Sequence, residues 1–157
     1  MNTPNRPEVD IDTTARSPLR LGIDTGEQVW LNTSVALARV RAPELRRLAR
    51  NVAVARREQP DCDVVADIQV VIAGTADEAR TALAASARQP DPGALLYVGT
   101  VTGVVGLIVD LYSLGITDGA VLIPVVDGAV IDLIRNEVLP ELATFLPIAV
   151  GDQEQPG

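Results

Sequence analysis

The last third of the chain sets the strongest constraint on its fold. Residues 97–124 run from a short turn through an apolar segment to Gly115, and then to a second apolar segment at residues 119–123. Thr100 can cap a helix, because its side-chain oxygen can accept from the free amides of the first turn. Gly115 suits the left-handed backbone that often ends a helix. An uninterrupted apolar strand is typical of a parallel sheet covered on both faces, so this stretch predicts a βα unit.

The chain upstream alternates between strand and helix patterns. Strands are predicted at residues 8–12, 28–32 and 64–72, with residues 95–98 left open. Helices are predicted from Pro18 to a point near residues 22–26, over residues 42–58, from residue 76 to about residue 88, and around Pro140. Thr75 and Glu78 have the spacing of a capping box, which places the start of the third helix. This alternation predicts parallel α/β architecture in one domain.

Charge and composition exclude several classes of function. The 157 residues carry a net charge of −8, which argues against a general nucleic-acid or anionic-membrane partner. The arginines of residues 42–58 are therefore interpreted as the solvated face of an amphipathic helix. All 13 basic residues are Arg and there is no His, so the chain offers no imidazole base or imidazole metal ligand. No metal site is expected.

Cysteine content and apolar runs indicate the compartment. Cys62 is the single cysteine, so no disulfide forms within the chain, and a reducing compartment suits it. Asp61 and Asp63 flank it, and their negative charges disfavour a thiolate and therefore a catalytic thiol. Residues 1–12 have no apolar signal region, and no apolar run is long enough to span a bilayer. We expect a cytoplasmic protein.

The last third also carries a family resemblance. Residues 98–100, 114–115, 118–119 and 137–142, spaced around an apolar helix and strand, resemble the end of the luciferase-like flavin-dependent monooxygenases. In that family this pattern implies the last βα unit of a TIM barrel. Residues 8–12 with the following loop look like a mid-barrel strand, so the resemblance covers most of this chain.

The fold class implied by this resemblance is a partial TIM barrel. The chain resembles the C-terminal half of a luciferase-like (β/α)8 barrel, made of parallel βα units. We expect residues 1–7 to be a flexible leader, residues 8–146 the truncated α/β domain, and residues 147–157 a flexible tail.

The function implied is a flavin-dependent oxidoreductase or monooxygenase that uses FMN or a deazaflavin. In the family, the flavin ring and substrate are held largely by the half of the barrel that this chain does not match. The resemblance therefore implies a chain that is inactive alone and depends on a partner half-barrel. The alternative is a non-catalytic, oligomerising remnant of the fold that acts as an interaction protein. Catalytic residues and substrate are not identified.

Three hydroxyl residues are the candidate cofactor contacts. The family commonly binds the flavin phosphate in a mid-barrel loop that enters a helix, and Thr13, Thr14 and Ser17 occupy the comparable loop. A helix N-terminus offers free amides to an anion, although an ordinary polar turn with a helix cap explains the same residues.

Two further patterns invite a functional interpretation. Asp10, Asp12 and Asp67 could gather at a cation or act as a carboxylate pair, but unpaired exposed acids are the favoured interpretation. Residues 99–103 lack the spacing of a phosphate-binding loop and are interpreted as a helix cap.

The helix predicted at residues 102–113 is apolar around most of its circumference. Besides its core stripe it carries Val105, Val109 and Tyr112 on a second flank. We expect a homodimer, or a heterodimer with a second half-barrel, through these three residues. The alternative is that residues 95–96 and the Pro-containing last helix cover them from within the chain.

Overall fold

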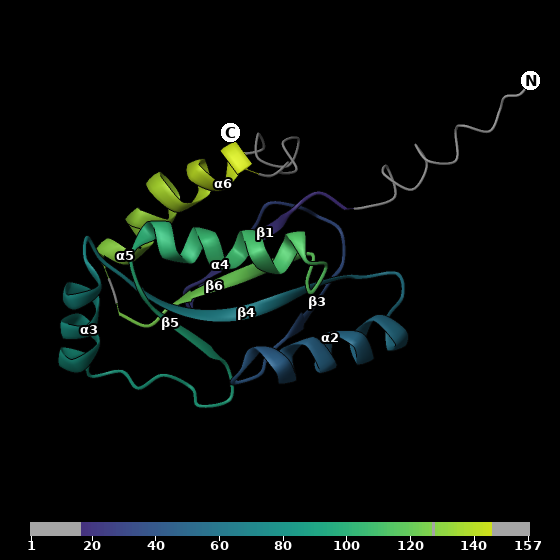
Figure 1. Ribbon diagram of the computed structural model, residues 1–157, viewed down its shortest axis with the longest axis horizontal. Helices are drawn as coiled ribbons and strands as arrows, with labels where there is room; N and C mark the ends of the chain where they lie inside the picture. The colour runs from purple at the N-terminus through teal and green to yellow at the C-terminus, as the bar shows by residue number, and fades with distance from the viewer. Residues whose placement is uncertain (1–16, 127, 146–157) are drawn as a thin grey trace, which may run out of the picture.

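The sheet is built around its longest strand, β4 (Asp63–Ile72), in the computed structural model, which describes residues 17–126 and 128–145. One edge of β4 pairs with β6 (Gly119–Pro124). Its other edge is shared, because β3 (Leu37–Val40) pairs with its first half and β5 (Leu95–Gly99) with its second half. All these pairings are parallel. The long central strand is visible in Figure 1.

The sheet continues beyond β6 to a hairpin. β1 (Arg20–Asp24) pairs in parallel with β6, and β2 (Val29–Leu31) pairs antiparallel with β1. The strand order along the sheet is therefore β2-β1-β6-β4-β3, with β5 beside β3 on the same edge of β4. A Cβ on Gly119 would lie 1.7 Å from the carbonyl oxygen of Arg20, so β1 and β6 approach this closely only with glycine there.

The two faces of this sheet differ in composition. The apolar face, which carries Ile68, Val70 and Leu122, packs under α2 (Leu45–Glu58), α4 (Val101–Ser113) and the final helical segment. On the charged face, which carries Arg39, Asp67 and Gln69, α3 (Ala76–Ala85) lies over the carboxyl end. There α3 packs through Ala79 on Val71 and Val125.

The sheet curls around its charged face. Arg39 on β3 donates a hydrogen bond of 3.0 Å to Asp24 at the end of β1, although β4 and β6 lie between these two strands. Three strand spacings in a flat sheet would amount to about 14 Å, beyond the combined reach of the two side chains. The described strands therefore form an incomplete, barrel-like wall of parallel βα units, as the sequence predicted.

The strand order departs from that of an uninterrupted barrel at one place. In a closed (β/α)8 barrel each strand pairs with the next, and all helices lie outside. Here β5 and β6 flank β4 on opposite sides, so the crossovers β4–α3–β5 and β5–α4–β6 run in opposite directions. Right-handed crossovers then place α3 and α4 on opposite faces, as observed.

Most predicted elements are confirmed, including two helix caps. The side chain of Thr75 accepts from the amide of Glu78 at 3.1 Å, and that of Thr100 accepts from Gly103 at 3.3 Å. Gly115 has φ 75° after α4, as expected for a left-handed helix end. Residues 95–98, left open from the sequence, belong to β5.

Two short strands correct the sequence prediction. Residues 20–24 form β1 instead of a helix, because Leu21 and Ile23 point into the core of the apolar face and their backbone pairs with β6. Ser17 therefore caps no helix. The strand β3 was not predicted. The predicted strand at residues 8–12, the leader at residues 1–7 and the tail at residues 147–157 lie outside the described residues.

The last helical segment has three parts. α5 (Ala129–Leu133) passes into a π-helical turn, η1 (Ile134–Val138), and then into α6 (Leu139–Phe145). The amide of Leu139 donates to the carbonyl of Ile134, five residues earlier. Pro140 has no amide hydrogen, so a regular helical bond is lost at this point and a wider turn is accommodated. No described helix is long and apolar enough to cross a bilayer.

This last segment covers the flank of α4 on which association was expected. Val105 and Tyr112 are 2% and 7% exposed, and Val109 packs half-buried against the same core. Tyr112 also donates its hydroxyl hydrogen to the carbonyl of Ser17. The Pro-containing last helix therefore covers this flank from within the chain, which was the alternative to association, because η1 and α6 pack against α4. Association with a second half-barrel stays a prediction, and it would need another surface.

Candidate functional site

The carboxyl ends of β4 and β6 mark the site that the topology favours. These strands are neighbours, and the helices that follow them lie on opposite faces: α3 on the charged face, and α5 with its continuation on the apolar face. In open parallel α/β sheets, ligands bind outside the strand ends where the chain direction divides in this way. The loops that follow β4 and β6 leave the carboxyl edge of the sheet toward opposite faces, and this leaves a crevice between them.

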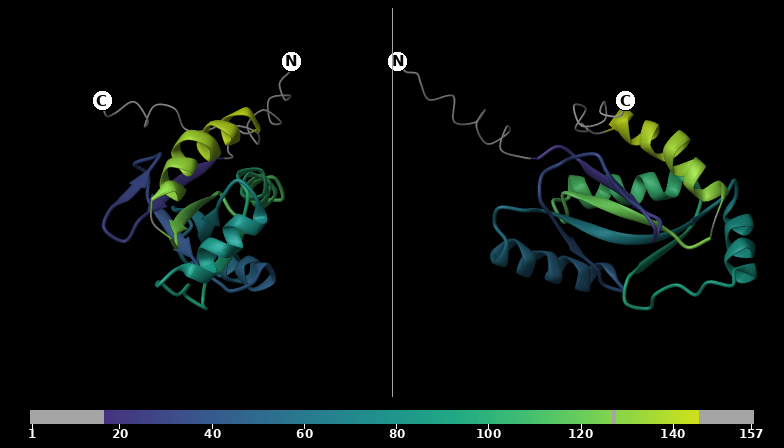
Figure 2. Two further views of the ribbon diagram at one scale, coloured as in Figure 1. Left: turned by 90° about the vertical axis from the view of Figure 1, so that its left-hand side faces the viewer. Right: turned by 180° about the vertical axis from the view of Figure 1, so that it is seen from behind.

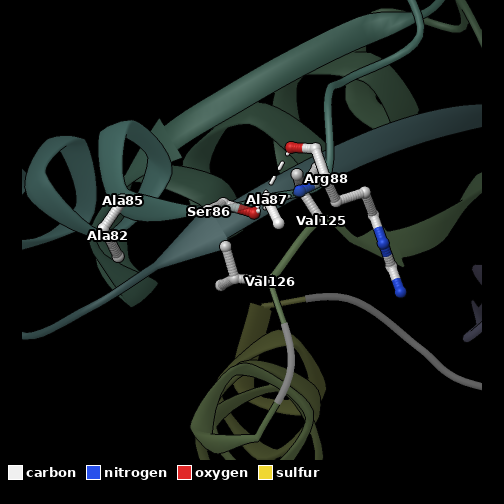
Figure 3. Close-up of a pocket in the computed structure, with 7 residues that line it drawn as sticks. All are labelled: Ala82, Ala85, Ser86, Ala87, Arg88, Val125 and Val126. Carbon is white, nitrogen blue, oxygen red and sulfur yellow. Dashed lines mark hydrogen bonds between the residues drawn. The ribbon is translucent and has the colours of Figure 1, made fainter.

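A pocket of about 530 Å³ opens beside this point (Figure 3). It is lined by the end of α3, the residues that follow it, and the residues that follow β6: Ala82, Ala85, Ser86, Ala87, Arg88, Val125 and Val126. Its volume lies within the range of small-molecule sites. Most of the lining is small and apolar.

Two polar side chains of this pocket are held locally. The Ser86 hydroxyl accepts from the Arg88 amide at 3.1 Å and donates to the Arg88 carbonyl at 3.3 Å. The Arg88 guanidinium donates to the carbonyl of Pro124 at 3.1 Å, which ties it to the end of β6. Figure 3 shows this side chain extending away from Ser86. The pocket thus combines an apolar wall with a cation at one end, which suits a ligand with an apolar body and an anionic group.

A charged network crosses the charged face next to this edge. Asp67 is central: its side chain is 5% exposed, and it accepts from Arg39 at 2.8 Å and from Arg41 at 3.1 Å. Arg39 continues to Asp24 on β1, and Arg41 continues to Asp91 in the loop before β5. The network therefore links β1, β3, β4 and that loop through alternating charges.

The network favours the charged forms of Asp24 and Arg39. Burial raises the pKa of Asp24, but hydrogen bonds from the Gly26 amide and from Arg39 outweigh it, so the pKa lies below its ordinary value of 3.8. Burial likewise lowers the pKa of Arg39, and its bonds to Asp67 and Asp24 raise the pKa above the ordinary value. These groups stay charged at neutral pH, so they are suited to positioning and not to proton transfer.

Gln69 holds the loop that closes this face. Its amide nitrogen donates to the carbonyl of Asp91 at 2.9 Å, and its oxygen accepts from the Asp91 amide at 2.6 Å. These bonds fix the position of Asp91, whose carboxylate pairs with Arg41. The buried carboxamide is thus a structural support of the network.

Only some of the site residues predicted from the sequence lie in the part of the chain that the structure describes. Thr13, Thr14, Asp10 and Asp12 lie outside the described residues. Ser17 lies at the opposite, amino edge of the sheet, where its hydroxyl donates to Asp63 at 2.8 Å. The role of Thr13, Thr14 and Ser17 as flavin-phosphate contacts stays a prediction.

The interpretation of Asp67 as an unpaired, exposed acid was wrong, because its side chain is 5% exposed and pairs with two arginines. Asp67 is held by arginines, and residues 17–126 and 128–145 contain no group of three side chains that could hold a metal ion. The site residues that sequence reasoning missed are Arg39, Arg41 and Arg88. Among the residues that line the pocket, Val125 and Val126 could have been found from the sequence, because they directly follow the predicted apolar strand and so lie at its carboxyl end.

Comparison with known proteins places the fold. No family description and no curated protein sequence matches the chain. Its structure is similar to riboflavin lyase RcaE, solved with modified FMN and riboflavin, with a TM-score of 0.55 and 19% identity. It is also similar to EDTA monooxygenase EmoA from Chelativorans sp. BNC1, with a TM-score of 0.52 and 14% identity.

Both similarities span only part of the neighbouring chain. Each covers 69% of this chain, but 38% of RcaE and 42% of EmoA. The two neighbours are luciferase-like flavin monooxygenases. The resemblance seen in the sequence is thereby confirmed at the level of the fold, which is that of part of a luciferase-like TIM barrel.

Proposed function

We propose that this chain supplies part of a luciferase-like, flavin-dependent oxidoreductase or monooxygenase. The cofactor proposed is FMN, with a deazaflavin as the alternative. The observation that carries the proposal is the curled parallel sheet, which matches part of the barrel in two flavin monooxygenases. A cytoplasmic location, which the single Cys62 suits, belongs to the same proposal.

The described residues fit a flavin in part. Ala82, Ala85 and Val126 would contact the apolar ring system, and Arg88 would lie near an anionic group. A flavin, when bound, would accept electrons from a reductant in its oxidised form and donate them to a co-reactant in its reduced form. The charged network would keep the strand edge in shape, since its carboxylates are paired. This open pocket needs further cover to exclude water, which we assign to additional barrel strands, from the same polypeptide or from a second copy or another chain.

Flavin titration tests this proposal. Purified protein is titrated with FMN, and separately with a deazaflavin, while flavin fluorescence is followed. Ala85→Trp should weaken binding about tenfold or more, because the indole fills the pocket that the ring would occupy. Arg47→Ala, on the exposed side of α2, serves as the matched control and should bind as the parent does.

The outcomes separate cofactor binding from dependence on a partner. Absence of binding by either flavin, or equal binding by the Ala85→Trp variant, contradicts the assignment of the pocket. Sustained flavin-dependent turnover by a monomer of this chain contradicts the need for further barrel strands.

A non-catalytic interaction protein is the second candidate function. It is favoured by the pairing within the charged network, where both carboxylate oxygens of Asp67 are occupied by arginines. A network of this kind offers no free acid or base. Association without flavin binding, measured by light scattering across a dilution series alongside the titration, would support this candidate.

A further inference from the structure

A second pocket lies on the other side of the sheet. It has a volume of about 410 Å³ and opens between the β1–β2 hairpin and the π-helical turn η1. Its lining consists of Ile23, Thr25, Gln28, Val29, Trp30 and Arg135. Ile23 and Trp30 belong to the core of the apolar face, so this pocket is separate from the one beside the charged face. The hairpin is at the back of Figure 1, and Figure 2 shows the molecule from that side.

The floor and one wall of this pocket are apolar and partly aromatic. Ile23 is 1% exposed and forms its base. Trp30, the single tryptophan of the chain, is half-buried on β2 and presents an indole ring to the same space. A flat indole surface at a pocket wall favours planar ligands, because offset stacking adds to the burial of apolar area.

The opposite wall carries a cation that has no counter-ion among the described residues. Arg135 is exposed, and its guanidinium makes no hydrogen bond or ion pair with any described residue, although Asp132 lies one turn before it. The described residues that line this pocket include no Asp or Glu. Arg135 also belongs to η1, and π-helical turns occur frequently at functional sites because they redirect side chains.

Polar atoms complete the rim. Thr25 and Gln28 close the hairpin turn: the Thr25 amide donates to the Gln28 carbonyl at 3.0 Å, and the Thr25 side-chain oxygen Oγ1 accepts from the Gln28 amide at 3.2 Å. The carboxamide of Gln28 has no partner among the described residues, so it remains able to donate to a ligand and accept from it. One cation and one carboxamide suit a ligand with one anionic group; a nucleotide would require more positive charge.

We propose that this pocket binds a small aromatic carboxylate, with its ring against Trp30 and its carboxylate on the guanidinium of Arg135. The planar guanidinium can bind a carboxylate through two parallel hydrogen bonds. The pocket volume is at the lower end of the range for small-molecule sites and fits a ligand of one or two rings. This inference is independent of the flavin assignment, because the residues of the two pockets do not overlap.

The single tryptophan makes the test direct. The probe is phenylacetate, and the readout is the indole N–H signal of Trp30 in a nitrogen–proton correlation spectrum of the full chain. The expected result is a saturable shift with a Kd below about 1 mM. Arg135→Gln should weaken binding about tenfold to a hundredfold, as expected for loss of a charge-assisted pair. Phenylacetamide, which lacks the negative charge, should bind the parent protein more weakly than phenylacetate by a similar factor.

Two controls keep the test falsifiable. Arg47→Ala removes an exposed arginine on α2 and should leave the titration unchanged. Adding FMN should not displace phenylacetate, since the pockets are distinct. An indole signal that does not shift overturns the proposal, as does equal binding of acid and amide or unchanged binding by Arg135→Gln.

Discussion

The two faces of the sheet are stabilised in different ways. Both bury residues completely, since Ile68 on the apolar face and Val65 and Val121 on the charged face are all 0% exposed. The apolar face lies under α2, α4 and the last helical segment, and its contacts are non-directional. On the charged face, alternating charges connect strands that are not neighbours. Burial therefore fixes the layers of the molecule, and directional pairing fixes the curl of the sheet.

The largest effect should come from removing volume on the apolar face. Ile68→Ala should lower the free energy of unfolding by about 2–5 kcal/mol, because Ile68 is 0% exposed and its truncation loses buried contacts and leaves a cavity in the core. Urea denaturation measures the change. Leu96→Ala is the matched control, because Leu96 is 40% exposed on the adjoining strand β5. Equal losses at the two positions would show that the apolar face is not the main source of stability.

An intermediate effect is expected at the centre of the charged face. Asp67→Leu should cost about 1–3 kcal/mol, because two arginines lose their carboxylate; the loss stays below that of a fully buried pair, since Arg39 is 31% exposed. Combining Asp67→Leu with Arg39→Leu should recover much of this loss, since an apolar pair leaves no stranded charge on Arg39. The double-mutant cycle is read from urea unfolding curves. Strict additivity would mean that the pair is not coupled.

The smallest effect concerns acid. The folded pKa of Asp24 lies below its ordinary value of 3.8, so its pairing stabilises the fold above that value and is lost as pH falls through the lower folded pKa. In the Asp24→Asn variant, stability should therefore fall less steeply than in the parent as the pH drops below about 4. Near neutral pH, the dependence of stability on pH should be the same in both proteins. Thermal unfolding from pH 2 to pH 7 shows the difference, and parallel curves for parent and variant would contradict it.

Local signals predicted the elements that depend on local chemistry. Thr75, Thr100 and Gly115 specified helix ends because caps and left-handed turns are set by neighbouring residues. The strand β1 was mistaken for a helix because it is short and follows Ser17-Pro18, a sequence that suits a helix start equally well. Its identity is decided by pairing with β6, which lies about a hundred residues downstream.

The charged network was beyond the reach of the sequence for a similar reason. Alternation placed Asp67 and Gln69 on one side of their strand, but their partners Arg39 and Asp91 are far away in the chain. Arginine is common here, and nothing in the pattern distinguished Arg39 from the solvated arginines of α2. The pockets were missed because they form between segments joined only by the fold.

The three-way pairing of β4 determines how the molecule can open. β3 and β5 divide one edge of β4 between them, and β6 runs along the other. Fraying of either short edge strand leaves half of that edge paired and the β6 edge intact. Solvent therefore reaches the β4 amides that are bonded to β6 only when the sheet is lost as a whole, and their hydrogen exchange reports global unfolding. The edge strands exchange by separate local openings, so cooperativity in this molecule is concentrated in a single ten-residue segment.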